Sequence, residues 1–370
     1  MKQQVVLTIA LLLGTPLLAQ NSILRPVMAE EAVSAYSSSE ASTPDADADL
    51  AQQQAPPPTT TQSEIKRPKA EGSMVGYIDD AIIGSQIRIR FDAAFNDPFP
   101  DRSEFFYGKC ACYQQLAKAD PAAYDPNAPG PGPGVPTNLN FQQLYLFGEY
   151  APKSRFSVFF ELPFRWIQPQ GFVNTGFTPF GNQGGVSDVN MGVKLGLIDS
   201  ERSALTFQFK SYLPSGNASE GLGTNHSSIE PALLLYHSFS SRWELEGQLG
   251  DWHPIDGSRG VPTVGSSSFA GDVFFYGIGP SAEVYHNSSV AIAPIIELVG
   301  WHVLGGFQTQ VPGPVASVAA QASGTNIVNM KFGVRTTIHN HNSVYVGYGR
   351  ALTDADWYRD IVRVEYRYAF

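Results

Sequence analysis

From about residue 86 to the C-terminus, apolar and polar side chains alternate along successive segments of roughly ten residues. In the segment 187–198, for example, Val189, Met191 and Val193 alternate with Asn190 and Lys194. Successive side chains of an extended strand point to opposite faces, so this period of two predicts strands with one apolar face. Twelve such segments follow one another, at 85–96, 139–150, 155–167, 187–198, 203–213, 228–239, 242–252, 271–285, 289–303, 326–338, 343–351 and 358–370.

The connections between these segments alternate in length. Every second connection is a tight turn, at 151–154, 199–202, 240–241, 286–288 and 340–342, and those between them are long and rich in Gly, Pro, Ser and Asn. Short turns at one rim and long loops at the other are typical of an outer-membrane barrel. A soluble sandwich also shows period two, but its strands are usually shorter and its turns do not sort by length. We therefore predict an all-β fold, a transmembrane antiparallel up-and-down β-barrel of about 12 strands.

Composition agrees with a barrel and excludes other classes. Only 16% of residues are charged, the net charge is −10, and Lys and Arg together (24) are fewer than Asp and Glu (34), so we expect no nucleic-acid partner. After the first twenty residues no apolar run of about 18 residues occurs, which excludes a helical membrane span. Lipid cannot hydrogen-bond an open strand edge, so strands that cross it must close into a barrel.

The N-terminal residues differ from the rest of the chain. Residues 1–20 combine Lys2, a short apolar run and small residues, a pattern that predicts a secretory signal peptide cleaved after Ala19 or as late as Ala29, with a membrane anchor as the alternative. Residues 21–72 are rich in Ser, Ala, Asp, Gln and Pro and predict a disordered periplasmic linker. An even number of strands places both barrel ends at the short-turn, periplasmic rim.

A short segment, 73–84, precedes the first strand. Met74, Ile78, Ala81 and Ile82 have helical spacing, which predicts a short plug-like element in the periplasmic mouth of the barrel 73–370. The alternative is an extension of the disordered linker.

The last strand alternates apolar or aromatic residues with Arg and Glu and ends in Tyr366, Tyr368 and Phe370. This pattern resembles the C-terminal signal that the barrel-assembly machinery of Gram-negative bacteria reads; a soluble edge strand is the alternative. Five tryptophans near strand ends are expected in the aromatic girdles that meet outer-membrane lipid: Trp166, Trp243, Trp252, Trp301 and Trp357.

Two motifs carry a family resemblance. Gly185-Val-Ser-Asp-Val-Asn-Met-Gly-Val-Lys194 leads into a strand, and Ser211-Tyr-Leu-Pro-Ser-Gly216 leads from a strand into a loop. Together with the closing aromatic strand, they resemble the outer-membrane family named for the meta-pathway of phenol degradation, over roughly residues 140–370. The resemblance implies passive traffic of small solutes, aromatic or hydrophobic ones included. The Pro-rich N-terminal segment and the large first loop depart from the family pattern.

The phase of the strands places charged residues toward the lumen. A basic wall is expected from Arg88, Arg90, Lys331, Arg335, Arg363 and Arg367, and an acidic wall across from it from Glu230, Glu244, Glu246, Glu283 and Glu297. One interpretation is a transverse field that orients polar solutes in an open pore. The other is a lumen filled by salt bridges among the same residues.

The remaining chemical signals are weak. Cys110 and Cys112 in the first long loop are candidates for a strained disulfide, with free or intermolecular thiols as the alternative. We expect no cofactor and no metal site. A membrane-embedded lipid hydrolase would need an activated Ser and an oriented His, and no such set is placed by pattern. The sequence therefore predicts a non-enzymatic channel for small solutes, with a blocked, surface-binding barrel as the alternative and its long loops as the working parts.

Overall fold

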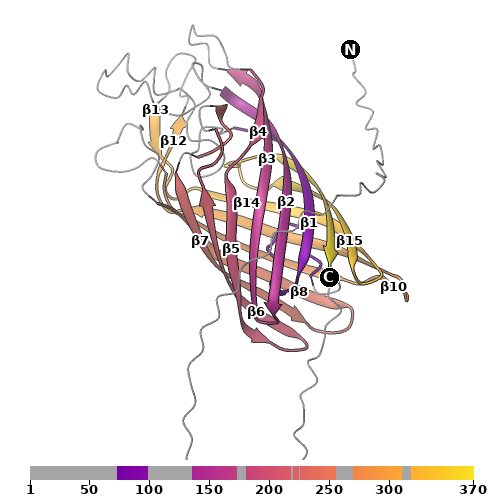
Figure 1. The fold of residues 1–370 in the computed structure, drawn as a ribbon. Helices are drawn as coiled ribbons and strands as arrows, with labels where there is room; N and C mark the ends of the chain where they lie inside the picture. Colours follow the sequence, from indigo (N-terminus) through magenta and orange to yellow (C-terminus); the bar gives the residue numbers. More distant parts are fainter. Residues whose placement is uncertain are drawn as a thin grey trace, which may run out of the picture. The chain divides into compact units, whose positions relative to one another are not determined.

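The computed structural model describes residues 73–98, 136–172, 181–217, 220–224, 226–255, 270–310 and 318–370. Twelve long strands in these ranges form one antiparallel sheet (Figure 1). They are β1 (Gln86–Asp97), β2 (Pro136–Lys153), β3 (Phe156–Phe172), β5 (Val189–Asp199), β6 (Ser203–Leu213), β7 (Ser227–Ser238), β8 (Trp243–Ile255), β9 (Val273–Ala282), β11 (Val290–Val303), β14 (Asn326–Ile338), β15 (Asn342–Ala351) and β16 (Asp360–Ala369).

The sheet closes on itself. Each long strand pairs with the long strands before and after it, and β1 pairs with β16 from Gln86↔Ala369 to Phe95↔Asp360. The predicted 12-stranded up-and-down barrel is therefore confirmed. No helix in the described ranges is long and apolar enough to cross a membrane.

Four short strands were not predicted. β4 (Gln183–Val186) pairs with β3, β10 (Tyr285–His286) pairs with β11, and β12 (Phe307–Gln310) and β13 (Val318–Gln321) form a separate hairpin in a long connection. β4 continues β5 along β3, because β5 pairs only with the first part of β3 and β4 pairs farther along. Ser187 and Asp188 interrupt the strand between them, and the Ser187 amide donates to the Pro163 carbonyl (2.9 Å).

The connections alternate as predicted. Short links join β2 to β3, β5 to β6, β7 to β8, β9 to β11 and β14 to β15, and longer ones lie at the opposite rim. The start of β1 and the end of β16 both lie at the short-turn rim, where the Phe370 amide donates to the Ser85 carbonyl (3.0 Å). The residues that lead into β1 therefore approach from that rim.

The two faces of the barrel differ sharply in polarity. On β16, Val362 and Val364 are about two-fifths exposed on the outside, whereas Arg363 and Glu365 are 8% and 1% exposed on the inside. The same alternation holds on β1, β5 and β14, so large apolar side chains cover the exterior and charged ones the interior. This inverts the pattern of a soluble protein and is expected of strands that face lipid.

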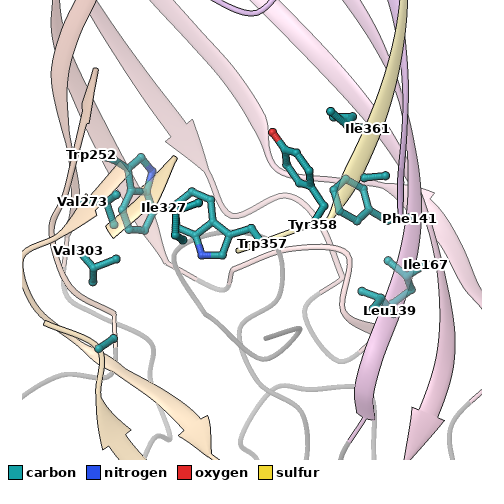
Figure 2. Close-up of a cluster of buried hydrophobic side chains, with 12 residues drawn as sticks. Leu139, Phe141, Ile167, Trp252, Val273, Val303, Ile327, Trp357, Tyr358 and Ile361 are labelled. Carbon is teal, nitrogen blue, oxygen red and sulfur yellow. The ribbon is translucent and has the colours of Figure 1, made fainter. Parts of the chain in front are cut away.

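Buried apolar side chains also collect inside the barrel near the long-loop rim. Figure 2 shows Trp357 and Tyr358, from the β15–β16 connection, among side chains of the surrounding strands. Trp166 and Trp243 are exposed on the outside, as a girdle requires, but Trp252 and Trp357 are buried inside and Trp301 packs against them. The girdle assignment was wrong for these three, because Trp252 and Trp301 have the phase of the inward-facing residues of β8 and β11, and Trp357 lies in a connection that folds inward.

Candidate functional site in the barrel lumen

Residues 73–84, here called the lumen segment, lie inside the ring of strands (Figure 1). Ser73, Met74, Val75 and Ile78 are each at most 4% exposed. The helical spacing of its apolar residues does not correspond to a helix, because the segment has an irregular, bent backbone. Its backbone groups bond to side chains of the barrel wall instead of to one another, and a local sequence pattern carries no sign of such partners.

Acidic and amide side chains of β8 and β11 accept the main-chain N–H groups of the lumen segment. Glu246 accepts from the amides of residues 74 and 75 (2.8 and 3.3 Å). Glu297 accepts from those of residues 76, 77 and 78 (3.2, 2.8 and 2.9 Å). Gln248 accepts from the amide of residue 79 (2.8 Å). Six consecutive N–H groups thus have partners on the wall.

Basic side chains of the wall donate to the carbonyl groups of the same segment. Arg335 donates to the carbonyls of residues 74 and 75 (2.9 and 2.6 Å), and Arg363 donates to that of residue 76. Arg367 and Lys194 donate to the carbonyls of residues 73 and 80 (3.4 and 2.9 Å). Acidic side chains of the wall therefore accept from the N–H groups of the lumen segment, and basic side chains of the wall donate to its carbonyl groups.

Side chains of the lumen segment add further contacts. Asp79 accepts from Gln208 (2.8 Å) and Lys210 (3.1 Å), and Asp80 forms an ion pair with Arg367 (3.3 Å). Burial disfavours the charged form of Asp79, but the Lys210 ammonium and the Gln208 amide outweigh it and lower the pKa of this carboxyl below its usual range.

Gly76 fits closely against the barrel wall. A Cβ atom added there would collide with Cζ of Tyr345, whose side chain is fully buried. Met74, Val75 and Ile78 pack in the same apolar cluster as Tyr345, Ala293, Ile295 and Val299. A larger residue at position 76 therefore requires the segment or the ring to move.

The residues predicted as a basic wall lie inside the barrel, mostly beside carboxylates. Arg363 pairs with Asp92 (2.7 Å), Arg335 and Arg367 with Glu365 (2.9 and 3.3 Å), and Arg88 and Arg90 approach Glu161 (3.7 and 3.6 Å). Sequence reasoning did not include Asp92, Glu161 and Glu365 among the site residues. Their inward phase on β1, β3 and β16 is the signal that could have identified them.

The residues predicted as an acidic wall have four different sets of partners. Glu246 and Glu297 bind the lumen segment, and Glu230 accepts from Lys210 (2.8 Å) and Tyr212 (2.7 Å). Glu244 accepts from the Tyr236 hydroxyl (2.8 Å). Glu283 lies beyond β9 in the turn and contacts His286 (3.2 Å), so it does not join the others. Opposite charges are thus interleaved around the lumen.

Lys331 differs from the five arginines of the predicted basic wall, because no carboxylate of the described residues lies within ion-pair distance of it. Its ammonium donates to the Tyr358 hydroxyl (2.6 Å) and lies 3.8 Å from the centre of the Tyr77 ring. The Trp301 ring is 5.9 Å away. One buried side chain therefore contacts both the lumen segment and the β15–β16 connection.

A cavity of about 310 Å³ lies in the lumen. Tyr77 and Asp79 of the lumen segment border it, together with charged side chains such as Arg165 and aromatic ones such as Trp301 and Trp357. Its walls thus offer ionic and aromatic surfaces to a small molecule.

The two sequence motifs meet at the interruption between β4 and β5. The Asp188 carboxylate accepts from the amides of Gly216 (2.9 Å) and Thr224 (2.7 Å) and from the Thr224 hydroxyl (2.8 Å). The Ser187 hydroxyl donates to the Leu222 carbonyl (2.6 Å). These bonds join the strand interruption to the β6–β7 connection.

Other predicted features lie on the surface or outside the described residues. Tyr366, Tyr368 and Phe370 face outward and are between 41% and 45% exposed. Cys110, Cys112, the signal peptide and the linker lie outside the described residues.

A closed antiparallel barrel with an apolar exterior and a charged interior defines the class of outer-membrane β-barrels. Residues 136–250 match the family described as "Putative MetA-pathway of phenol degradation". This match confirms the predicted resemblance over a stretch that contains both motifs.

Several solved structures are similar to this chain. An outer-membrane channel from Pseudomonas putida F1 has a TM-score of 0.46 and 15% identity, covering 78% of this chain and 96% of that one. The beta domain of the Bordetella autotransporter BrkA has a TM-score of 0.43 and 12% identity, covering 78% and 100%. The NanC porin has a TM-score of 0.39 and 7% identity, covering 77% and 100%. Comparison with curated protein sequences finds no match.

Proposed function

We propose that this protein is an outer-membrane channel that passes small solutes by passive diffusion through its charged lumen. The observation that carries the proposal is a closed barrel with an apolar exterior whose lumen holds a cavity of about 310 Å³ between charged and aromatic side chains. The lumen charges supply a local field that acts on polar solutes. The matched family description names phenol degradation, so a small neutral aromatic compound belongs among the test solutes.

The proposal includes an orientation. Short turns and both barrel ends share one rim, which is the periplasmic rim of an outer-membrane barrel. The linker 21–72 would then lie in the periplasm, and the outward-facing Tyr366, Tyr368 and Phe370 would be available to the barrel-assembly machinery.

The lumen segment acts in this proposal as a plug. A second candidate function is a blocked barrel whose long loops bind partners at the surface. The many hydrogen bonds between the main chain of the lumen segment and wall residues from β5 to β16 favour this function, because they hold the segment in the lumen. The two functions differ in whether the segment can leave its position.

The substitution Gly76→Val distinguishes the plugged channel from the blocked barrel. The added side chain collides with the enclosed Tyr345 ring and should weaken docking of the segment, while every charged wall residue stays in place. Gly148→Val is the matched control, because nothing lies within 4 Å of a Cβ added there. We expect ion conductance in planar bilayers, and swelling of liposomes in phenol or in a small sugar, to rise several-fold for Gly76→Val and to stay at the wild-type level for Gly148→Val.

The outcomes separate the candidates. A wild-type barrel that conducts ions, together with a higher conductance in Gly76→Val, supports a plugged channel. Absence of conductance and swelling in both, with folded barrels verified by heat-modifiable migration in gels, supports the blocked barrel and contradicts transport.

A further inference from the structure

Six wall residues around the lumen segment bind its main chain, and two of them, Glu246 and Arg367, also contact the side chains of Ser73 and Asp80. We call Glu246, Gln248, Glu297, Arg335, Arg363 and Arg367 the main-chain site. The first three accept six consecutive N–H groups, and the three arginines donate to the carbonyls of residues 73–76. Every peptide carries the same N–H and carbonyl groups.

The donors and acceptors of this site are buried and arranged in a complementary way. Glu246, Glu297 and Arg335 are 1%, 0% and 0% exposed. Buried charges without partners are costly, so departure of the segment favours any ligand that restores the same bonds. A simple anion satisfies only the arginines and a simple cation only the carboxylates. A chain of secondary amides that bends as the lumen segment does satisfies both.

We propose that the main-chain site binds short peptides in the same bent backbone conformation, and that the lumen segment occupies it as a built-in competitor. This inference rests on the proposed channel function, in which the segment leaves its position. The ligand class is a short peptide with apolar side chains, because Met74, Val75 and Ile78 pack against Ala293 and Ile295. One position must be glycine, because Tyr345 fills the space beside residue 76.

Peptide binding can be measured separately from conduction. The receptor is the full chain with Gly76→Val, purified in detergent, and the probe is the fluorescently labelled hexapeptide Ser-Met-Val-Gly-Tyr-Ile. The matched control peptide carries the same side chains but is N-methylated at its last four residues, which removes N–H donors to Glu246 and Glu297. A third peptide has Val in place of Gly.

We expect fluorescence anisotropy to report saturable binding of the unmodified peptide, at least tenfold tighter than that of the N-methylated and Gly-to-Val peptides. The wild type should bind it at least tenfold more weakly than Gly76→Val, because its own segment fills the site. Replacing Glu297 by Gln in the Gly76→Val background should weaken binding by a similar factor. If Gly76→Val does not refold, Gly76→Ala serves, since its Cβ alone meets the Tyr345 ring.

Equal binding of the unmodified and N-methylated peptides, or no binding to a folded Gly76→Val barrel, overturns the peptide site. In bilayers the unmodified peptide should also interrupt the Gly76→Val current reversibly. A conducting barrel that no peptide binds leaves the channel standing and removes the peptide site. A barrel that binds the peptide but never conducts removes the channel and keeps the binding site.

Discussion

Arg335 links the lumen segment to the barrel wall at the scale of a single residue. Its fully buried guanidinium donates to two carbonyls of the segment, to Ser343 (3.0 Å) and to Glu365 (2.9 Å). Removing this guanidinium deprives the buried Glu365 of the nearer of its two paired arginines, Arg335 and Arg367, and leaves two buried carbonyls of the segment without these donors. We therefore expect Arg335→Met to lower the free energy of unfolding by about 3 kcal/mol, measured by urea denaturation in detergent with tryptophan fluorescence.

Arg350→Met is the control for this substitution. Arg350 also pairs with an acid, Asp360 (3.3 Å), but its side chain is 55% exposed on the outer surface near a rim. Exposed pairs contribute little to stability, so the unfolding midpoint should stay at the wild-type value. Equal effects of the two substitutions would contradict the role assigned to burial.

At the scale of elements, Asp188 joins the β4–β5 interruption to the β6–β7 connection. Asparagine at this position keeps the size of the side chain but gives up the charge and one acceptor oxygen, so one of three donors loses its partner. We expect Asp188→Asn to cost about 1–3 kcal/mol and to expose residues 214–224 to limited proteolysis. Glu201→Gln, in the exposed β5–β6 turn, should leave the cleavage pattern unchanged.

The long elements could be predicted from the sequence, because the period of two is a local property of each strand. The short β4 and β12 could not, since each has only four residues. The path of residues 73–84 could not either, because its partners, such as Glu297 and Arg335, are more than 200 positions away. Strand phase did place those two side chains on the lumen face. The phase could not indicate that they bind a main chain instead of facing an open pore.

At the scale of the whole molecule, Lys331 connects two parts that enter the lumen. Its ammonium contacts Tyr77 of the lumen segment and Tyr358 of the β15–β16 connection. Trp357 of that connection packs against Trp301, with ring centres 5.1 Å apart. Lys331 has no carboxylate partner among the residues described. A movement of the lumen segment would therefore disturb its contact with Tyr77, and a movement of the β15–β16 connection would disturb its contact with Tyr358. Loosening one part should therefore loosen the other.

A double-mutant cycle of Tyr77→Leu and Tyr358→Phe measures this coupling. The readout is the open probability of single channels in planar bilayers, converted to a free energy of opening for each variant. We expect each substitution to favour opening and the pair to deviate from additivity by about 0.5 kcal/mol or more, as contacting residues do. In a Lys331→Met background the deviation should vanish, because the group that both tyrosines contact is gone.

The control cycle pairs Tyr77→Leu with Tyr150→Phe, whose side chain is exposed on the outside, and should be additive. Additivity in the first cycle would mean that the two parts move independently and that Lys331 only fills space between them.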